Sequence, residues 1–350
     1  MTMHGLVFDG PGASEWREVP LPTPQDDRDA IVRVDATTIC GTDLHILKGD
    51  VPEVSAGRIL GHEAVGTVVE AGPTIGWKVG DRVLVSCISG CGRCRFCREG
   101  RYGQCQGGGG WVLGHLIDGT QAEFVRVPFA DTSLFSVPDS VSDEAALMLS
   151  DITPTAYEVG VLNGMVRPGD TVVVVGSGPI GLAAVMTAQL FSPAHIVAVD
   201  TAASRLEAAK ALGADVVVDA RLGTEELTKV VAELTGGLGA DVAMEAVGTP
   251  ATFETCTEVV RPGGHVANIG VHGAAATLHL ETLWSRNVTI TTGLVDTSST
   301  PRLLSMVASG QLDVASLVTH RFQLHEMAEA YRVFSEAAET HALKVMLTRD

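Results

Sequence analysis

Basic residues are scarce in this chain of 350 residues. It has 24 Lys and Arg against 42 Asp and Glu, a formal net charge of −18. A surface that binds nucleic acid or an anionic membrane needs clustered Lys and Arg, which a chain of this balance does not supply. The sequence therefore predicts neither nucleic acid nor membrane as a partner, and the acidic excess indicates a solvated surface.

A targeting segment and a membrane span are also missing from the pattern. The start, MTMHGLVFDGPG, lacks the basic residues and apolar run of a secretory signal, so we expect a cytoplasmic protein. Residues 171–199 carry no charged side chain, but GSGPIG interrupts them and divides the run into a strand and a helix. With 45% hydrophobic and 19% charged residues, the chain is expected to fold around packed cores, and its length fits two domains.

Cysteine is rare and unevenly distributed. Four of the seven lie in the fifteen residues CGRCRFCREGRYGQC; they are Cys91, Cys94, Cys97 and Cys105. Disulfides are rare in a reducing cytoplasm, and the spacing C-x2-C-x2-C-x7-C suits four thiolates around one tetrahedral Zn²⁺ with no open position. We interpret the lobe 87–110 as a structural zinc site; an iron–sulfur cluster or metal-free thiols remain alternatives. Cys87 and Cys256 are interpreted as small buried apolar residues.

The middle of the chain alternates between strand and helix patterns. The expected strands are TVVVVG (171–176), HIVAVD (195–200), ADVVVD (214–219) and three later runs, ADVAMEAVG, GGHVANIGV and VTITTGLV. The expected helices cover 179–191, 204–213 with Ser204 as N-cap, and 224–237. Continuous apolar strands between helices predict an α/β domain with a doubly wound, parallel six-stranded sheet over 156–295.

The rest of the chain has a different spacing of apolar runs. In residues 1–155, short apolar runs are broken by Gly, Pro or Asp at intervals of ~10 residues, which is typical of a β-rich, barrel-like domain. Residues 296–350 contain two helical patterns and a last strand, ALKVMLT. We expect this tail to return to the first domain.

A glycine-rich turn predicts the dinucleotide site. VVVVGSGPIG reads G-x-G-x-x-G through Gly176, Gly178 and Gly181, between a strand and a helix, and Asp200 closes the next strand. The helix N-terminus would hold the pyrophosphate, and Asp200 would accept hydrogen bonds from the adenosine ribose, which favours NAD over NADP. The intervening loop residues are Ser177, Pro179 and Ile180. Arg205 keeps NADP open as an alternative.

A second metal site is indicated in ICGTDLHILKG and ILGHEAVGTVVEAG. Cys40 ends an apolar strand pattern, and His62 with Glu63 stands between two glycines. A catalytic zinc needs three protein ligands and one free position. Cys40 and His62 supply two ligands, and local spacing does not identify the third.

These motifs resemble the zinc-dependent medium-chain alcohol dehydrogenase family, closest to its bacterial secondary-alcohol members. CGTDLH, GHEAVGTVVEAG, VGDRV, the four-cysteine lobe, GSGPIG and the tail ALKVML occur in the family's order along the whole chain. The resemblance implies a second zinc per chain, NAD as cofactor, and Asp151 as third ligand where many members have Cys. A carboxylate is a harder ligand than a thiolate, so the metal should be more Lewis acidic.

The resemblance also implies roles for the residues around the zinc and a path for the proton. Asp43 would orient the His62 imidazole. Glu63 would either bind zinc transiently or act as an outer carboxylate. Zinc lowers the pKa of the substrate hydroxyl, the hydride passes to the nicotinamide, and the proton leaves from Thr42 through the nicotinamide ribose to His45. Alternatively, Asp151 only caps a helix and His45 is a surface residue.

The substrate pocket is less well specified by the sequence. Trp111 resembles the aromatic wall of secondary-alcohol members, although ordinary packing is an equal interpretation. Val247 and Leu294 are expected on the cofactor side of the pocket. The remaining histidines, His115 among them, are interpreted as surface or capping residues. The absence of a basic cluster near the site favours a small, apolar alcohol, ketone or aldehyde as substrate.

Three other functions are alternatives for these motifs, and the residues present disfavour the last two. A polyol or L-threonine dehydrogenase of the same family is one, because CGTDLHI also resembles threonine dehydrogenases. A non-catalytic dinucleotide sensor would lack a ligand or relay residue. A zinc-free quinone reductase would lack Cys40, His62 and the four-cysteine lobe. We also expect a homotetramer or homodimer that pairs the strand VTITTGLV across two subunits.

Overall fold

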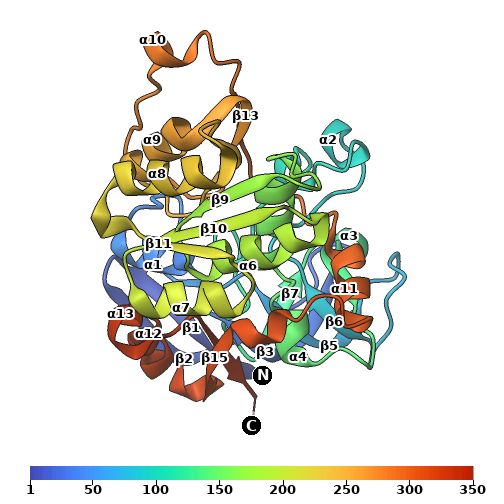
Figure 1. Ribbon diagram of the computed structural model, residues 1–350. Helices are drawn as coiled ribbons and strands as arrows, with labels where there is room; N and C mark the ends of the chain where they lie inside the picture. Colours follow the sequence, from blue (N-terminus) through green and yellow to red (C-terminus); the bar gives the residue numbers. More distant parts are fainter. Residues whose placement is uncertain (350) are drawn as a thin grey trace. The chain divides into compact units, whose positions relative to one another are not determined.

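The computed structural model describes residues 1–349 and divides into two compact units (Figure 1). The first unit combines Met1–Pro154 with the segment from Val295 onward, and the second is Thr155–Leu294. Among the described residues, no helix is both long enough and apolar enough to cross a bilayer. The uncharged run 171–199 contributes a strand, β9 (Thr171–Val175), a helix, α6 (Pro179–Ala188), and most of a second strand, β10 (His195–Asp200), to the second unit. A turn separates β9 from α6, and a 3-10 helix at Gln189–Phe191 follows α6 before β10.

The second unit is built on one parallel sheet. Its strands are β9 (Thr171–Val175), β10 (His195–Asp200), β11 (Val216–Asp219), β12 (Ala240–Glu245), β13 (Val260–Asn268) and β14 (Thr289–Thr292). They lie in the order β11-β10-β9-β12-β13-β14, with every neighbouring pair parallel. The order reverses between β9 and β12, which is the switch point where ligands bind in doubly wound sheets. The predicted six-stranded dinucleotide-binding fold is confirmed.

Helices cover both faces of this sheet. They are α6 (Pro179–Ala188), α7 (Ala203–Ala211), α8 (Thr224–Thr235) and α9 (Pro250–Val259), with a π-helix at Ala156–Leu162 and the short α10 (Leu280–Leu283). α6 and α7 lie on one side and α8 and α9 on the other (Figure 1). The apolar strands therefore bury both faces, as the valines of β9, all 4% exposed or less, show.

The predicted N-cap of α7 is wrong. The helix begins at Ala203, and Ala202 occupies the N-cap position without a side-chain hydrogen bond. Asp200 takes over the local hydrogen bonding, because its Oδ1 accepts the Ala202 N–H at 2.9 Å. The turn after β10 is thus closed by the strand's last residue, and Ser204 lies inside the first helical turn.

The first unit is rich in β-structure, as predicted. Its strands are β1 (Thr2–Gly10), β2 (Ala13–Pro20), β3 (Ala30–Thr38), β4 (Arg58–Ile59), β5 (Ala64–Ala71), β6 (Arg82–Val85), β7 (Phe124–Val127), β8 (Leu134–Ser136), β15 (Val318–Gln323) and β16 (Lys344–Thr348). One sheet has the order β2-β1-β4, and the other has the order β15-β16-β3-β5-β6-β8, with β7 also paired to β3.

The helices of this unit are short. They are α1 (Gly41–Lys48), α2 (Arg95–Arg98), α3 (Ala130–Ser133), α4 (Asp143–Leu147), α5 (Ile152–Thr155, which ends at the first residue of the second unit), α11 (Thr300–Ala308), α12 (Met327–Ser335) and α13 (Ala337–Thr340). The C-terminal tail joins the larger sheet, because β16 pairs antiparallel with β3 and places Leu347 opposite Thr37. Ile39, Ile46 and Leu347 belong to the core cluster that α1 and α12 help to form.

Candidate active site

Strand pairing in the first unit brings distant residues to one edge of the larger sheet. β3 and β5 are antiparallel with Thr37 opposite Ala64, and β5 and β6 are antiparallel with Ala64 opposite Val85. Residues just after β3, just before β5 and just after β6 therefore meet. The start of β16 reaches the same edge, because Met346 lies opposite Thr38.

Four potential metal ligands converge at this edge. They are Cys40, His62, Glu63 and Asp151, and one ligand atom from each lies within 4.8 Å of the others. Oδ2 of Asp151 is 3.4 Å from Nε2 of His62 and 3.6 Å from Sγ of Cys40. The structure thus brings together the three proposed zinc ligands, although Asp151 is 111 residues from Cys40.

Local structure fixes the positions of the first two of these residues. Cys40 is the N-cap of α1, and its backbone N–H donates to Oδ2 of Asp43 at 2.9 Å. Asp43 also accepts a hydrogen bond from Nε2 of Gln121 at 3.0 Å. Gly61 precedes His62 with φ +90, and a Cβ there would lie 2.6 Å from Cγ of Gln121. Only glycine fits this turn without displacement, so the glycine before His62 has a steric cause.

Asp43 and His62 face each other in the interior. Nδ1 of His62 lies 3.8 Å from Oδ1 of Asp43, which is longer than a hydrogen bond. Both atoms are buried and have no hydrogen-bond partner within residues 1–349. The imidazole therefore points Nδ1 toward Asp43 and Nε2 toward Asp151, as a ligand binding through Nε2 requires.

Glu63 forms a buried ion pair that the sequence did not predict. Its Oε1 accepts a hydrogen bond from Nζ of Lys344 at 2.7 Å, and both side chains are 1% exposed. Lys344 also donates to the carbonyl oxygen of Ile39 at 3.0 Å. Burial raises the pKa of Glu63 to about 7, with Lys344 opposing the shift.

The donor set fits a bound divalent cation. Thiol, imidazole and carboxylate groups are the usual ligands of zinc. Burial raises the pKa of the Cys40 thiol, and Oε2 of Glu63 is buried without a hydrogen-bond partner in the described chain. Burial lowers the pKa of His62, but Asp151 and Cys40 outweigh it, so the net pKa lies well above its usual range. A divalent cation would add positive charge beside Glu63 and Asp151, which already contact Lys344 and His62, respectively.

The four cysteines of the lobe form a separate cluster. One sulfur from each of Cys91, Cys94, Cys97 and Cys105 lies within 4.8 Å of the others, and all seven cysteines of the chain are free. Backbone N–H groups donate to three of the sulfurs: that of Cys91 to Cys105 at 3.3 Å, Cys94 to Cys91 at 3.4 Å, and Cys97 to Cys94 at 3.5 Å. Such bonds favour the thiolate form that binds metal.

The dinucleotide motif has the geometry that its glycines require. Gly176 has φ +99, and a Cβ on Gly181 would lie 1.8 Å from the carbonyl oxygen of Gly176. This close approach lets α6 begin directly after β9. Oδ2 of Asp200 accepts the Ser177 N–H at 2.8 Å, and Nη1 of Arg205 is 3.9 Å from the same oxygen. Asp200 thus lies at the tip of β10 beside the loop.

Thr42 and His45 both lie on α1, in its first and last turns. Oγ1 of Thr42 is 3.7 Å from Sγ of Cys40. Nδ1 of His45 is 2.8 Å from Oδ2 of Asp50, and the histidine side chain is 39% exposed. The helix therefore carries one side chain beside the metal-ligand cluster and, one turn later, one that is partly exposed to solvent.

Trp111 lies beside the ligand cluster. Its ring meets His62 edge-on at 6.2 Å and stacks on His115 at 4.2 Å between ring centres. His115, expected at the surface or at a cap, is instead half-buried, with Nδ1 3.0 Å from the Trp111 carbonyl oxygen. In the second unit, Val247 and Leu294 are 48% and 46% exposed.

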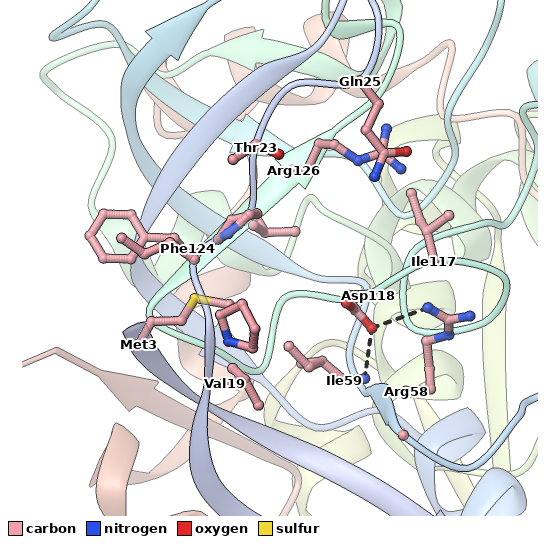
Figure 2. Close-up of a pocket in the computed structure, with 16 residues that line it drawn as sticks. Met3, Val19, Thr23, Gln25, Arg58, Ile59, Ile117, Asp118, Phe124 and Arg126 are labelled. Atoms are coloured by element: carbon pink, nitrogen blue, oxygen red, sulfur yellow. Dashed lines mark hydrogen bonds and ion pairs between the residues drawn. The ribbon is translucent and has the colours of Figure 1, made fainter. Parts of the chain in front are cut away.

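A cavity of about 370 Å³ lies elsewhere in the first unit, and no member of the ligand cluster lines it. Figure 2 shows its polar side: Arg58 and Asp118 pair at 3.1 Å. Arg126, also on the wall, pairs with Asp29 at 3.0 Å. Its arginines are already matched by carboxylates, so we assign no ligand to it.

Three residues near the ligand cluster were missed from the sequence. Lys344 belongs to the tail motif ALKVML, in which nothing marks it as functional. Gln121 connects Asp43 to the Tyr331 hydroxyl, which donates to Oε1 of Gln121 at 2.8 Å. Cys87 is buried as expected, but its Sγ lies 3.6 Å from Oδ1 of Asp151. Backbone hydrogen bonds with Leu6 and Leu60 hold Gln121, and one with Ser150 holds Cys87, whereas Lys344 lies on β16. All of these contacts join residues that are distant in the sequence, so local spacing does not reveal them.

Comparison with known proteins identifies the family. Residues 26–139 match the alcohol dehydrogenase GroES-like domain, and residues 179–309 match the zinc-binding dehydrogenase family. An alcohol dehydrogenase of Cupriavidus necator is 38% identical over 362 residues, covering 95% of each chain.

Solved structures agree. The apo form of zinc-dependent alcohol dehydrogenase 2 from Streptococcus pneumonia is 47% identical with a TM-score of 0.95, covering 99% of each chain. An alcohol dehydrogenase from Thermus sp. ATN1 is 36% identical with a TM-score of 0.92, covering 99% of this chain and 100% of that one. The chain therefore belongs to the zinc-dependent medium-chain alcohol dehydrogenases and is an oxidoreductase.

Proposed function

We propose that the enzyme is an NAD-dependent dehydrogenase of small secondary alcohols, with Cys40, His62 and Asp151 holding a catalytic zinc. The single observation that carries this proposal is the convergence of those three side chains within 4.8 Å. Three protein ligands leave the open position that a substrate oxygen needs. The four lobe cysteines would hold a second, structural zinc with no open position.

Bound in this site, zinc would supply Lewis acidity toward the substrate oxygen, and NAD would be the hydride acceptor. The chain's own residues would handle the proton. Thr42, whose Oγ1 lies 3.7 Å from Sγ of Cys40, would hydrogen-bond the substrate oxygen. His45, half-exposed on the same helix, would release the proton to water.

The contact with Asp50 supports His45 as the outer end of the relay. A carboxylate only accepts hydrogen bonds, so Nδ1 of His45, 2.8 Å from Oδ2 of Asp50, carries the hydrogen. In the neutral ring, Nε2 is then the basic atom that can take up a proton. Asp50 would thus select the useful tautomer.

Asp200 supports NAD as cofactor. Its carboxylate stands at the tip of β10, where it would accept hydrogen bonds from ribose hydroxyls and repel a 2′-phosphate. Relatives at 27% and 26% identity have been solved with NADP and with NADH, respectively, so the family accommodates both cofactors.

We expect Asp200→Gly to lower the NAD/NADP ratio of kcat/KM by about tenfold or more, since one charge-assisted hydrogen bond contributes roughly 1.5–3 kcal/mol. An unchanged ratio would remove Asp200 from the ribose site.

We also propose a homo-oligomer, a tetramer or dimer, in the cytoplasm. β14 is an edge strand of its sheet, and the neighbouring segment exposes large apolar side chains: Val271, Leu278, Leu280 and Trp284. An unpaired edge beside an exposed apolar patch favours pairing with a second copy. Seven free cysteines are compatible with a reducing compartment.

A panel of alcohols with NAD and NADP tests the proposal. Simple secondary alcohols should give a higher kcat/KM than primary alcohols, sorbitol or L-threonine, and the reverse reaction should reduce the matching ketones. Higher activity on L-threonine or sorbitol would favour the alternative of a polyol or amino-acid dehydrogenase. Binding of NAD without turnover of any alcohol would indicate a sensor.

A further inference from the structure

Cys87 is a buried thiol beside the proposed catalytic zinc site. It lies two residues after the end of β6, and its backbone N–H donates to the carbonyl oxygen of Ser150 at 3.1 Å. Its Sγ lies 3.6 Å from Oδ1 of Asp151. The backbone and the side chain of Cys87 therefore contact two successive residues, Ser150 and Asp151. These contacts hold the thiol beside Asp151.

The two oxygens of Asp151 have different surroundings. Oδ2 faces Nε2 of His62 at 3.4 Å and Sγ of Cys40 at 3.6 Å. Oδ1 faces Cys87. A carboxylate that binds a metal through one oxygen can accept a hydrogen bond on the other, and such outer contacts orient the ligand. The geometry assigns Oδ2 to the metal and Oδ1 to Cys87.

We propose that Cys87 is a positioning residue for Asp151: its S–H group donates to Oδ1 and holds Oδ2 toward Cys40 and His62. The inference rests on the proposed function, because it takes Asp151 as a zinc ligand. Cys87 does not belong to the group of four whose ligand atoms lie within 4.8 Å of one another, so we assign it no bond to the metal.

The alternative is that Cys87 only fills space. It is 3% exposed and follows a strand whose residues belong to an apolar core. The two roles predict different results for substitutions. A donor role is retained by serine, whose hydroxyl donates a hydrogen bond, and is lost with alanine or valine. A packing role depends on volume and tolerates apolar residues best.

The test measures zinc affinity rather than turnover. Cys87→Ala, Cys87→Val and Cys87→Ser would be titrated with a competing chelator, with the lobe zinc of the same molecule as internal reference. Loss of an outer contact weakens metal binding about 10–100-fold. We expect this loss of zinc affinity in the Ala and Val variants at the site of Cys40, His62 and Asp151. The Ser variant should stay within about threefold of the native affinity. In the cobalt-substituted protein, the visible d–d bands should shift for Ala and Val and stay close to native for Ser.

Cys256→Ala is the matched control, because Cys256 is also a fully buried thiol but lies in the core of the second unit. This variant should leave the zinc affinity of both sites, the four-cysteine lobe and the site of Asp151, unchanged. Native affinity in Cys87→Ala and Cys87→Val, or equal weakening in all three Cys87 variants, would overturn the donor role. If Ala fails to fold, the comparison of Val with Ser decides. A native enzyme that holds only the lobe zinc would overturn both the proposed function and this inference, whereas native affinity in the Ala and Val variants would overturn this inference alone.

Discussion

The two ligand clusters of the first unit are encoded in different ways. The lobe collects four cysteines from fifteen consecutive residues. The other cluster collects Cys40, His62 and Asp151 from a stretch in which the first and last are 111 residues apart. A local cluster can be recognised from spacing, whereas the dispersed one depends on the pairing of β3 with β5 and of β5 with β6.

The groups that support the two clusters also differ: they are local in the lobe and distant in sequence in the dispersed cluster. The lobe sulfurs accept hydrogen bonds from backbone N–H groups of their own loop. The dispersed cluster is supported by side chains outside the cluster: Asp43 on α1, Lys344 on β16 and Cys87 after β6. The lobe is therefore suited to hold a metal for stability, and the dispersed cluster is suited to hold one whose orientation matters for a reaction.

The largest effect that separates the clusters should come from Asp151→Ala. Removal of a ligand at the dispersed cluster should lower kcat by a factor on the order of 10³ or more, because a metal supplies several kcal/mol of transition-state stabilisation. Thermal unfolding should change little. Asp139→Ala, an exposed carboxylate, is the control. Full activity of Asp151→Ala would remove this residue from the ligand set.

Cys97→Ser should give the opposite pattern. Binding of a structural zinc contributes folding free energy, so loss of one lobe ligand should lower the melting temperature by several degrees or more. Treatment of the native enzyme with a strong chelator should produce a similar drop. Calorimetry in which the variant melts like the native protein would show that the lobe is not a folding element.

The sequence predicted the local features of both units well. The glycine loop between β9 and α6, the six parallel strands and the four-cysteine cluster each depend on neighbouring residues. Asp151 was identified through family resemblance, because nothing in its neighbourhood marks it as a ligand. Lys344 and Cys87 were not predicted, since their contacts arise from β16 pairing with β3 and from β6 pairing with β5.

A buried ion pair is a further difference between the two clusters. The dispersed cluster has one, between Lys344 and Glu63. Removal of one partner of a buried ion pair costs roughly 3–5 kcal/mol, so Lys344→Met should lower the free energy of unfolding by about that amount. Adding Glu63→Gln should recover part of the loss. Lys48→Met, at an exposed position of α1, serves as control. Urea denaturation with equal midpoints for the native enzyme and Lys344→Met would contradict a stabilising pair.

The smallest effect concerns the acid–base behaviour of the lobe thiols. Backbone N–H groups, that of Cys97 first, lower the pKa of Cys94 to about 6, whereas burial raises the pKa of Cys97 to about 12. In the zinc-free protein, thiolate absorbance near 240 nm should therefore show a step near pH 6 from Cys94. The pKa of Cys91 is lowered as well, because burial, which raises it, is outweighed by the backbone N–H groups of Arg93 and Cys94. Because the folded pKa of Cys94 is depressed, its contribution to stability is complete above the ordinary thiol pKa and is lost as pH falls through 6.

A Cys94→Ala variant should lack this step. If the step persists in the zinc-free variant, the titration belongs to another thiol. If the step is absent from the zinc-free protein without the substitution, backbone hydrogen bonding does not lower the pKa of Cys94.

Zinc analysis of the purified native enzyme and of Asp151→Ala tests the central claim most directly. The account predicts two zinc ions per chain in the native enzyme and one in the variant, with the remaining ion in the four-cysteine lobe. Two ions retained in folded Asp151→Ala, or a single ion in the zinc-replete native enzyme, would contradict it.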